Sequence, residues 1–122
     1  MISWSTIAYG AALSALLAGV LVWLAARPDR WPAAIGAAVG AAAGPVAWNA
    51  ILRATHASTF FTDAPVVVMP ASWQDTGSGV FALAATALIL GLGPLAGATA
   101  RRTVTLSLLA GLAAFLVDVY LY

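Results

Sequence analysis

Four long apolar stretches occupy almost the whole of this 122-residue chain, and they leave room for little else. A helix needs about 20 predominantly apolar residues to cross the hydrocarbon core of a bilayer. The first stretch lacks the basic segment and the cleavage site of a signal peptide, so we expect it to be retained. The predicted helices cover residues 2–26, 31–52, 73–95 and 104–122. We therefore predict an all-α integral membrane protein, a four-transmembrane-helix bundle that forms a single domain over residues 1–122.

The composition agrees with a surface that faces lipid. Only 7% of the residues are charged, whereas soluble domains carry about 25%. The five basic residues are all arginine and are scattered, so they form no basic stripe for nucleic acid. The chain has no cysteine, which excludes disulfides and thiolate metal sites. The partner that this composition predicts is the lipid bilayer.

The arginines predict how the helices are oriented. Arg27 and Arg30 lie in the first short connection, and Arg101 and Arg102 lie in the second. Arginine is enriched on the cytoplasmic side of membrane proteins, so both short connections are predicted to be cytoplasmic; only Arg53 opposes this. Short turns also make consecutive helices antiparallel. We predict two antiparallel hairpins in the plasma membrane, N-out and C-out, with a structured extracytoplasmic connection between the second and third helices.

Most of the remaining polar residues gather at the predicted outer face. They are Asn49, Arg53, His56, Asp63, Asp75 and Asp118. Asn49, Arg53 and His56 are spaced by four and three residues, so they share one helical face if the second helix continues to about residue 61. Asp118 lies roughly 24 Å along the fourth helix, near the depth of Arg53. Because a charge inside a membrane needs a partner, we predict an Arg53–Asp118 ion pair.

Two further interpretations concern the aspartates near the third helix. The segment Ser72-Trp73-Gln74-Asp75 has the form of a capping box, so Asp75 is predicted to cap that helix. Alternatively, His56 with Asp63 and Asp75 could ligate a divalent metal, but zinc sites usually use closely spaced His and Cys, which are absent here. We predict no metal, no cofactor and no catalytic residue. Whether the outer cluster is functional or only structural stays open.

Small residues mark the surfaces on which helices are expected to pack. Gly36, Gly40 and Gly44 recur every four residues in the second helix, and Gly111 belongs to a small-residue face of the fourth. Such faces let helix backbones approach closely, which matters because lipid supplies no hydrophobic drive for helix association. Two interpretations remain: packing inside the four-helix unit, or a seam for a homo-oligomer.

Three classes of function are compatible with these patterns. The first, which we favour, is a non-enzymatic accessory or assembly subunit, or an oligomeric scaffold, in a membrane complex. The second is an oligomeric channel or transporter for a small solute or ion, with its mouth at the outer cluster. No chain of ionisable residues crosses the predicted membrane region, as a proton relay would need. The third class, a membrane enzyme acting on a lipid headgroup, has only one histidine available to it.

Overall fold

The computed structural model describes residues 2–27, 30–63, 65 and 69–121, and over these residues the chain is all-α. Its elements are α1 (Trp4–Ala25), α2 (Arg30–Thr55), the short 3₁₀ helix η1 (Ser58–Phe61), α3 (Trp73–Leu92) and α4 (Ala100–Leu121). Each of the four α-helices is long and apolar enough to cross a membrane, as the sequence predicts. This suggests an integral membrane protein.

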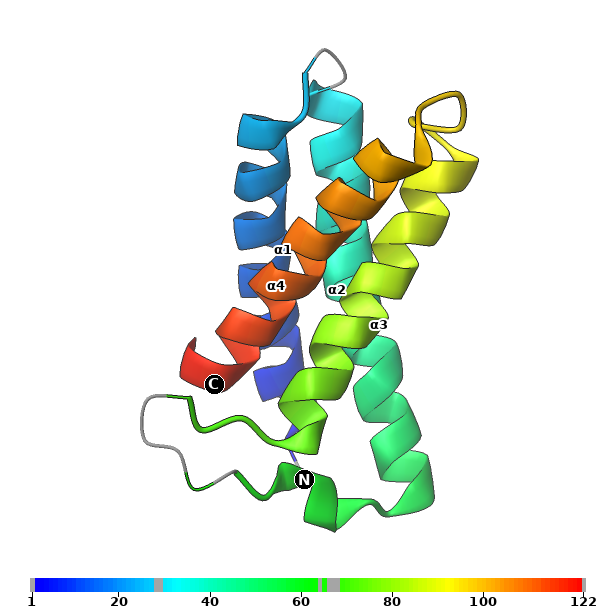
Figure 1. The fold of residues 1–122 in the computed structure, drawn as a ribbon. Coiled ribbons are helices and arrows are strands. Elements are labelled where there is room, and N and C mark those ends of the chain that lie inside the picture. The colour runs from blue at the N-terminus through cyan, green and yellow to red at the C-terminus, as the bar shows by residue number, and fades with distance from the viewer. Residues whose placement is uncertain (1, 28–29, 64, 66–68, 122) are drawn as a thin grey trace.

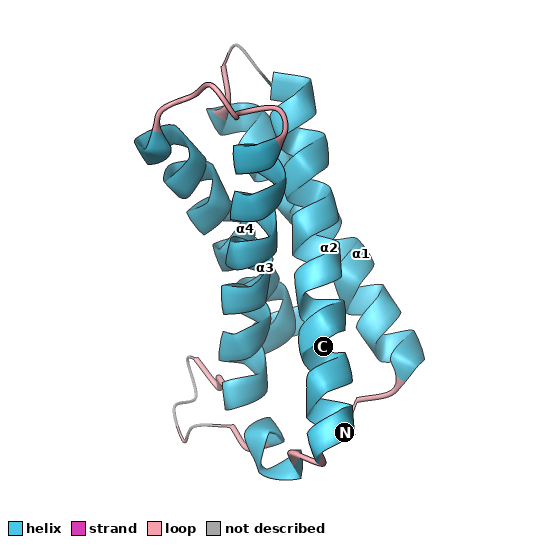
Figure 2. Ribbon diagram, turned by 90° about the vertical axis from the view of Figure 1, so that its right-hand side faces the viewer, coloured by secondary structure: helices cyan, strands magenta, loops and turns pink. Residues whose placement is uncertain are grey.

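The connections divide the bundle into two ends. Figure 1 shows the α1–α2 and α3–α4 connections at one end, which we call the short-loop end. The connection between α2 and α3 and both ends of the chain lie toward the opposite end, which we call the long-loop end. The side view in Figure 2 shows the same separation. Residues 64 and 66–68 of the long connection and 28–29 of the first short connection lie outside the described residues, so the predicted connections are described only in part.

The helix boundaries differ from the predicted ones by at most four residues; α3, for example, ends at Leu92 instead of residue 95. α2 ends at Thr55, which is beyond the predicted end at residue 52 but short of the possible extension to about residue 61. His56 has a left-handed backbone conformation, with φ of 53°, which a right-handed helix cannot continue. α4 begins at Ala100 instead of residue 104, because the Thr99 hydroxyl accepts a hydrogen bond (3.3 Å) from the backbone N–H of Arg102 and caps the first turn.

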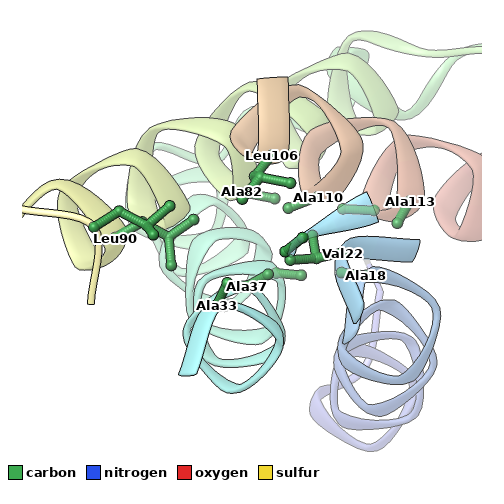
Figure 3. Close-up of a cluster of buried hydrophobic side chains, with 13 residues drawn as sticks. Ala18, Val22, Ala33, Ala37, Ala82, Leu90, Leu106, Ala110 and Ala113 are labelled. Carbon is green, nitrogen blue, oxygen red and sulfur yellow. The ribbon is translucent and has the colours of Figure 1, made fainter. Parts of the chain in front are cut away.

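The interior of the bundle is built largely of alanine. Figure 3 shows side chains from all four helices meeting in this core, with the labelled residues Ala18, Val22, Ala33, Ala37, Ala82, Leu90, Leu106, Ala110 and Ala113. Nearly all of these residues are completely buried. Because alanine is small, the helices pack with their backbones close together, and the many dispersion contacts that result stabilise a bundle in lipid.

The glycine face of α2 is the surface that meets α3. A Cβ atom added to Gly36 would lie 2.7 Å from Leu90 Cδ2, and one added to Gly44 would lie 2.5 Å from the backbone nitrogen of Ala82. A Cβ on Gly40, between them, would also overlap α3. At Gly40 and Gly44 the overlapping atoms include α3 backbone, which cannot move aside, so only glycine permits the approach at these two positions; at Gly36 the neighbour is a leucine side chain. The face is buried by the chain's own α3.

α3 and α4 approach one another at a second pair of glycines. A Cβ atom on Gly111 would lie 3.0 Å from the carbonyl oxygen of Gly79, and one on Gly79 would lie 3.2 Å from the carbonyl oxygen of Gly111. The approach is less tight than that between α2 and α3. α3 is therefore packed closely against both α2 and α4.

Candidate functional site

Three helices bring polar side chains together inside the bundle at the long-loop end. Gln74 of α3 lies at the centre: its Nε2 is 3.2 Å from Asn49 Oδ1 of α2 and 3.1 Å from Asp118 Oδ2 of α4. A third acceptor, Ser78 Oγ, lies 3.2 Å away, one turn further along α3. All four side chains are at most 2% exposed. We call Gln74, Asn49, Ser78 and Asp118 the buried polar network.

The local structure of α2 explains why Asn49 can take part. Its Nδ2 donates a hydrogen bond of 2.9 Å to the carbonyl oxygen of Pro45, one turn earlier in the same helix. This bond fixes the side-chain amide and leaves its oxygen free to accept from Gln74. Because these side chains are buried, each of their polar groups needs such a partner.

The start of α3 is fixed by the capping box that the sequence predicts, which confirms the role of Asp75. Ser72 Oγ accepts from the backbone N–H of Asp75 at 3.2 Å, and Asp75 Oδ2 accepts from the backbone N–H of Ser72 at 2.8 Å. Both residues are buried. The box satisfies two backbone donors of the first helical turn and so sets the position of Gln74, which lies within that turn.

A cavity of about 230 Å³ opens beside the buried polar network. It is lined by Ile2, Phe61, Asp63, Pro70, Ser72, Gln74, Asp75, Asp118 and Val119. Every charged side chain in this lining is acidic. The structure therefore brings Asp63, Asp75 and Asp118 of the predicted outer cluster to one cavity, and it connects Asn49 to that cavity through Gln74.

The predicted ion pair between Arg53 and Asp118 is wrong. Arg53 Nη2 instead donates a hydrogen bond of 2.6 Å to the carbonyl oxygen of Ile2, and its guanidinium lies 4.8 Å from the centre of the Trp4 ring. Asp118 faces Gln74. Arg53 points to the start of α1, whereas Gln74 of α3 approaches Asp118. Depth along a helix says nothing about direction around it.

His56 does not join the outer cluster. Its side chain is exposed, and it occupies the left-handed position that follows α2. There the backbone N–H of Ala57 donates to the carbonyl oxygen of Leu52 at 3.1 Å, and that of His56 donates to Arg53 at 3.4 Å, the hydrogen-bond pattern of a Schellman motif. The face predicted to run from Asn49 to His56 therefore stops at Arg53. Within the described part of the chain, no group of three His, Cys, Asp or Glu residues is arranged to hold a metal ion.

Trp48 links the long connection to the start of α3. Its Nε1 donates a hydrogen bond of 3.0 Å to the backbone carbonyl of Gln74. Its ring lies 5.0 Å from that of Phe81 and 6.0 Å from that of Phe60 in η1, measured between ring centres. A Cβ atom on Gly77 would overlap the Trp48 ring, so the glycine makes room for the indole. Trp48 thus supports the buried polar network from outside.

Sequence reasoning missed Gln74 and Ser78 as partners of Asn49 and Asp118. A usable signal was present, because Gln74 and Ser78 are four residues apart and face the same side of a helix at the start of an apolar stretch. Two polar side chains on one face of such a helix indicate a buried contact. Which residues they contact depends on how neighbouring helices rotate, and the sequence does not give that.

The site offers hydrogen-bond acceptors and negative charge, which suit water or a cation. The charged groups that line the cavity are carboxylates, and His56, the sole histidine of the chain, is not among the lining residues. Comparison of the chain with protein-family models, with curated proteins and with solved structures finds no match.

Proposed function

We propose that the protein is a non-enzymatic accessory or assembly subunit of a plasma-membrane complex. In this proposal the chain forms two antiparallel hairpins, with both termini and the long connection outside the cell. The observation that carries it is the buried polar network: Gln74 joins α2, α3 and α4 of the chain itself. Polar side chains that bond to one another hold a helix bundle in one arrangement, as a scaffold requires.

The alanine core supports the same proposal. Ala18, Ala37, Ala82 and Ala110, one from each helix, have no exposed surface. Because these alanines fill the space between the four helices, their packing favours a bundle without a pore through its centre. A channel built from this chain would then need several copies around a shared axis.

The outer surface offers broad apolar faces for lipid or for a membrane partner. Large apolar side chains are exposed on every helix, including Leu16, Ile35, Leu88 and Leu108. The glycine face of α2, by contrast, is covered by α3. A homo-oligomer or a larger complex would therefore assemble through these large side chains instead of through Gly36, Gly40 and Gly44.

A second candidate, cation binding coupled to transport, draws on the acidic cavity. Asp63, Asp75 and Asp118 line about 230 Å³ of space at the proposed outer mouth. An enzyme that acts on lipid headgroups has less support, because His56 does not line the cavity, and the Ser72 and Asp75 side chains of the lining are engaged in the capping box of α3.

One pair of experiments separates the two candidates. The tagged chain is purified from its native membranes in mild detergent and its complex is weighed by native mass spectrometry; the purified chain is then reconstituted in liposomes for cation-flux measurements. An accessory subunit gives a stoichiometric complex with another membrane protein and no flux above that of empty liposomes. Flux that Asp118→Asn abolishes but Asp29→Asn, in the sequence between α1 and α2, preserves would replace the accessory role with transport.

A further inference from the structure

A second site lies at the opposite end of the bundle, on its outer surface. α1 and α2 lie side by side (Figures 1 and 2). An open groove of about 670 Å³ is lined by residues of these two helices. Gly19, Ala34 and Ala38 form its floor, and Leu16 and Ile35 are among its walls. The lining is almost entirely apolar. Volumes of about 300–1,000 Å³ are typical of sites that hold small ligands.

Small residues create the groove. A Cβ atom on Gly19 would lie 3.7 Å from Ala38 Cβ and 3.8 Å from the carbonyl oxygen of Ala34, so the two helices are in contact along this floor. The side chains of Leu16 and Ile35 are 66% and 61% exposed and stand above it. The result is a trough along the helix direction, which matches the shape of an acyl chain lying beside a transmembrane helix.

The end of the groove carries two tryptophans and an arginine. The rings of Trp23 and Trp31 meet edge to face with their centres 5.9 Å apart, and both residues line the groove. The guanidinium carbon of Arg30 lies 4.1 Å from the centre of the Trp23 ring. Tryptophan favours the level of the lipid headgroups, because its ring is apolar and its N–H is polar. The groove therefore ends where a headgroup would lie.

Two buried donors at this end of the groove lack acceptors within the described residues. Arg30 Nε and Trp23 Nε1 have no hydrogen-bond partner there, and no ion pair of Arg30 is formed within the same residues. Buried donors are normally satisfied, and a phosphate oxygen is the acceptor that arginine binds best. Stacking on Trp23 holds the guanidinium in place without using its N–H groups.

We propose that this groove binds one anionic phospholipid, with an acyl chain between α1 and α2 and the phosphate on Arg30. Charge favours a lipid over a second copy of the chain. The short connections and the adjoining helix ends carry Arg27, Arg30, Arg101 and Arg102 but only one aspartate. A second copy inserted in the same direction would bring like charges together, whereas anionic headgroups are attracted to this end.

Native mass spectrometry of the detergent-purified chain with added phosphatidylglycerol or phosphatidylcholine tests the proposal. We expect one phosphatidylglycerol to be retained per chain, with about a fivefold preference over phosphatidylcholine. Arg30→Gln should abolish the preference. Arg101→Gln is the matched control, since it removes the same charge from an exposed residue at the same end but away from the groove. If both variants lost the preference for phosphatidylglycerol equally, general charge attraction would explain it, and the proposed site would be contradicted.

Two further measurements locate the acyl chain. Ala38→Phe should fill the groove and prevent retention of either lipid; if that variant fails to fold, Ala38→Leu is used. In the unmodified protein, phosphatidylglycerol with a diazirine in its acyl chain should label residues 16–24 and 31–38 in preference to α3 and α4. Uniform labelling, or a dimer that Ala38→Phe dissociates while lipid retention is unchanged, would contradict the proposal.

Discussion

The middle and the long-loop end of the α2–α3 contact are held together by different interactions. In the middle, Gly40 and Gly44 bring the two backbones close, and the contact depends on shape. At the long-loop end, Asn49 and Gln74 meet through a hydrogen bond, and the contact depends on chemistry. Lipid supplies no hydrophobic drive for either, so one helix pair uses both of the forces that remain, close packing and internal hydrogen bonding. The stability of the contact in the middle should depend on side-chain size, and that of the contact at the long-loop end on side-chain polarity.

The largest effect is expected from enlarging a glycine in the middle. Gly44→Ala places a Cβ atom 2.5 Å from α3 backbone atoms that cannot rotate away. The helices must separate, which should reduce the free energy of unfolding by about 3 kcal/mol even though alanine is the better helix former. Reversible unfolding in mixed micelles measures the change.

Gly97→Ala is the matched control for that substitution. A Cβ atom at Gly97 meets nothing within 4 Å, so the same change should leave stability within about 0.5 kcal/mol of the unmodified protein. Equal effects at Gly44 and Gly97 would show that the α2–α3 approach is not as close as described.

The next effect is expected from removing the polar centre. Gln74→Leu keeps approximate size but deprives Asn49 and Asp118 of a donor, so we expect a loss of about 2 kcal/mol. Asn49→Leu should be less damaging in the Gln74→Leu background than alone, because the two residues share a bond. The same unfolding assay completes this double-mutant cycle, and strict additivity would mean that the bond is not formed.

A smaller effect, an increase in stability, is expected from a substitution at His56, just after the end of α2. His56→Gly relieves the left-handed backbone at φ 53° and should stabilise the protein by about 0.5–1 kcal/mol. His56→Ala removes the imidazole equally but keeps a Cβ atom, so it should give no gain. If both substitutions behave alike, the imidazole matters and the backbone conformation does not.

The smallest effect is the coupling between Arg53 and Asp118. Each has its own partner, Ile2 and Trp4 for Arg53 and Gln74 for Asp118. Arg53→Gln and Asp118→Asn should therefore be additive within about 0.5 kcal/mol in a double-mutant cycle. A coupling well above that value would restore the ion pair that the sequence suggests.

The sequence predicts the spanning helices and the α3 cap because those features are local. A run of about 20 apolar residues and a Ser-x-x-Asp pattern each predict structure from residues that lie within one helix. The partner of Asp118 is not local, because it depends on the rotation of α2, α3 and α4 relative to one another. Small-residue faces occur on several helices, so the sequence could not show which of them meets Gly40. The left-handed residue at the end of α2 was missed because that position is usually glycine and here is histidine.

The hydrogen bond at the polar end can be measured directly, because the chain contains a single asparagine and a single glutamine. Labelling the glutamine side chain with ¹⁵N and the asparagine Cγ with ¹³C yields one possible pair in the protein, Gln74 and Asn49. Solid-state NMR in bilayers then measures their dipolar coupling. A 3.2 Å separation of Gln74 Nε2 and Asn49 Oδ1 predicts strong ¹³C–¹⁵N dephasing. Absence of dephasing in a folded sample would contradict the contact that joins α2 and α3 at the long-loop end.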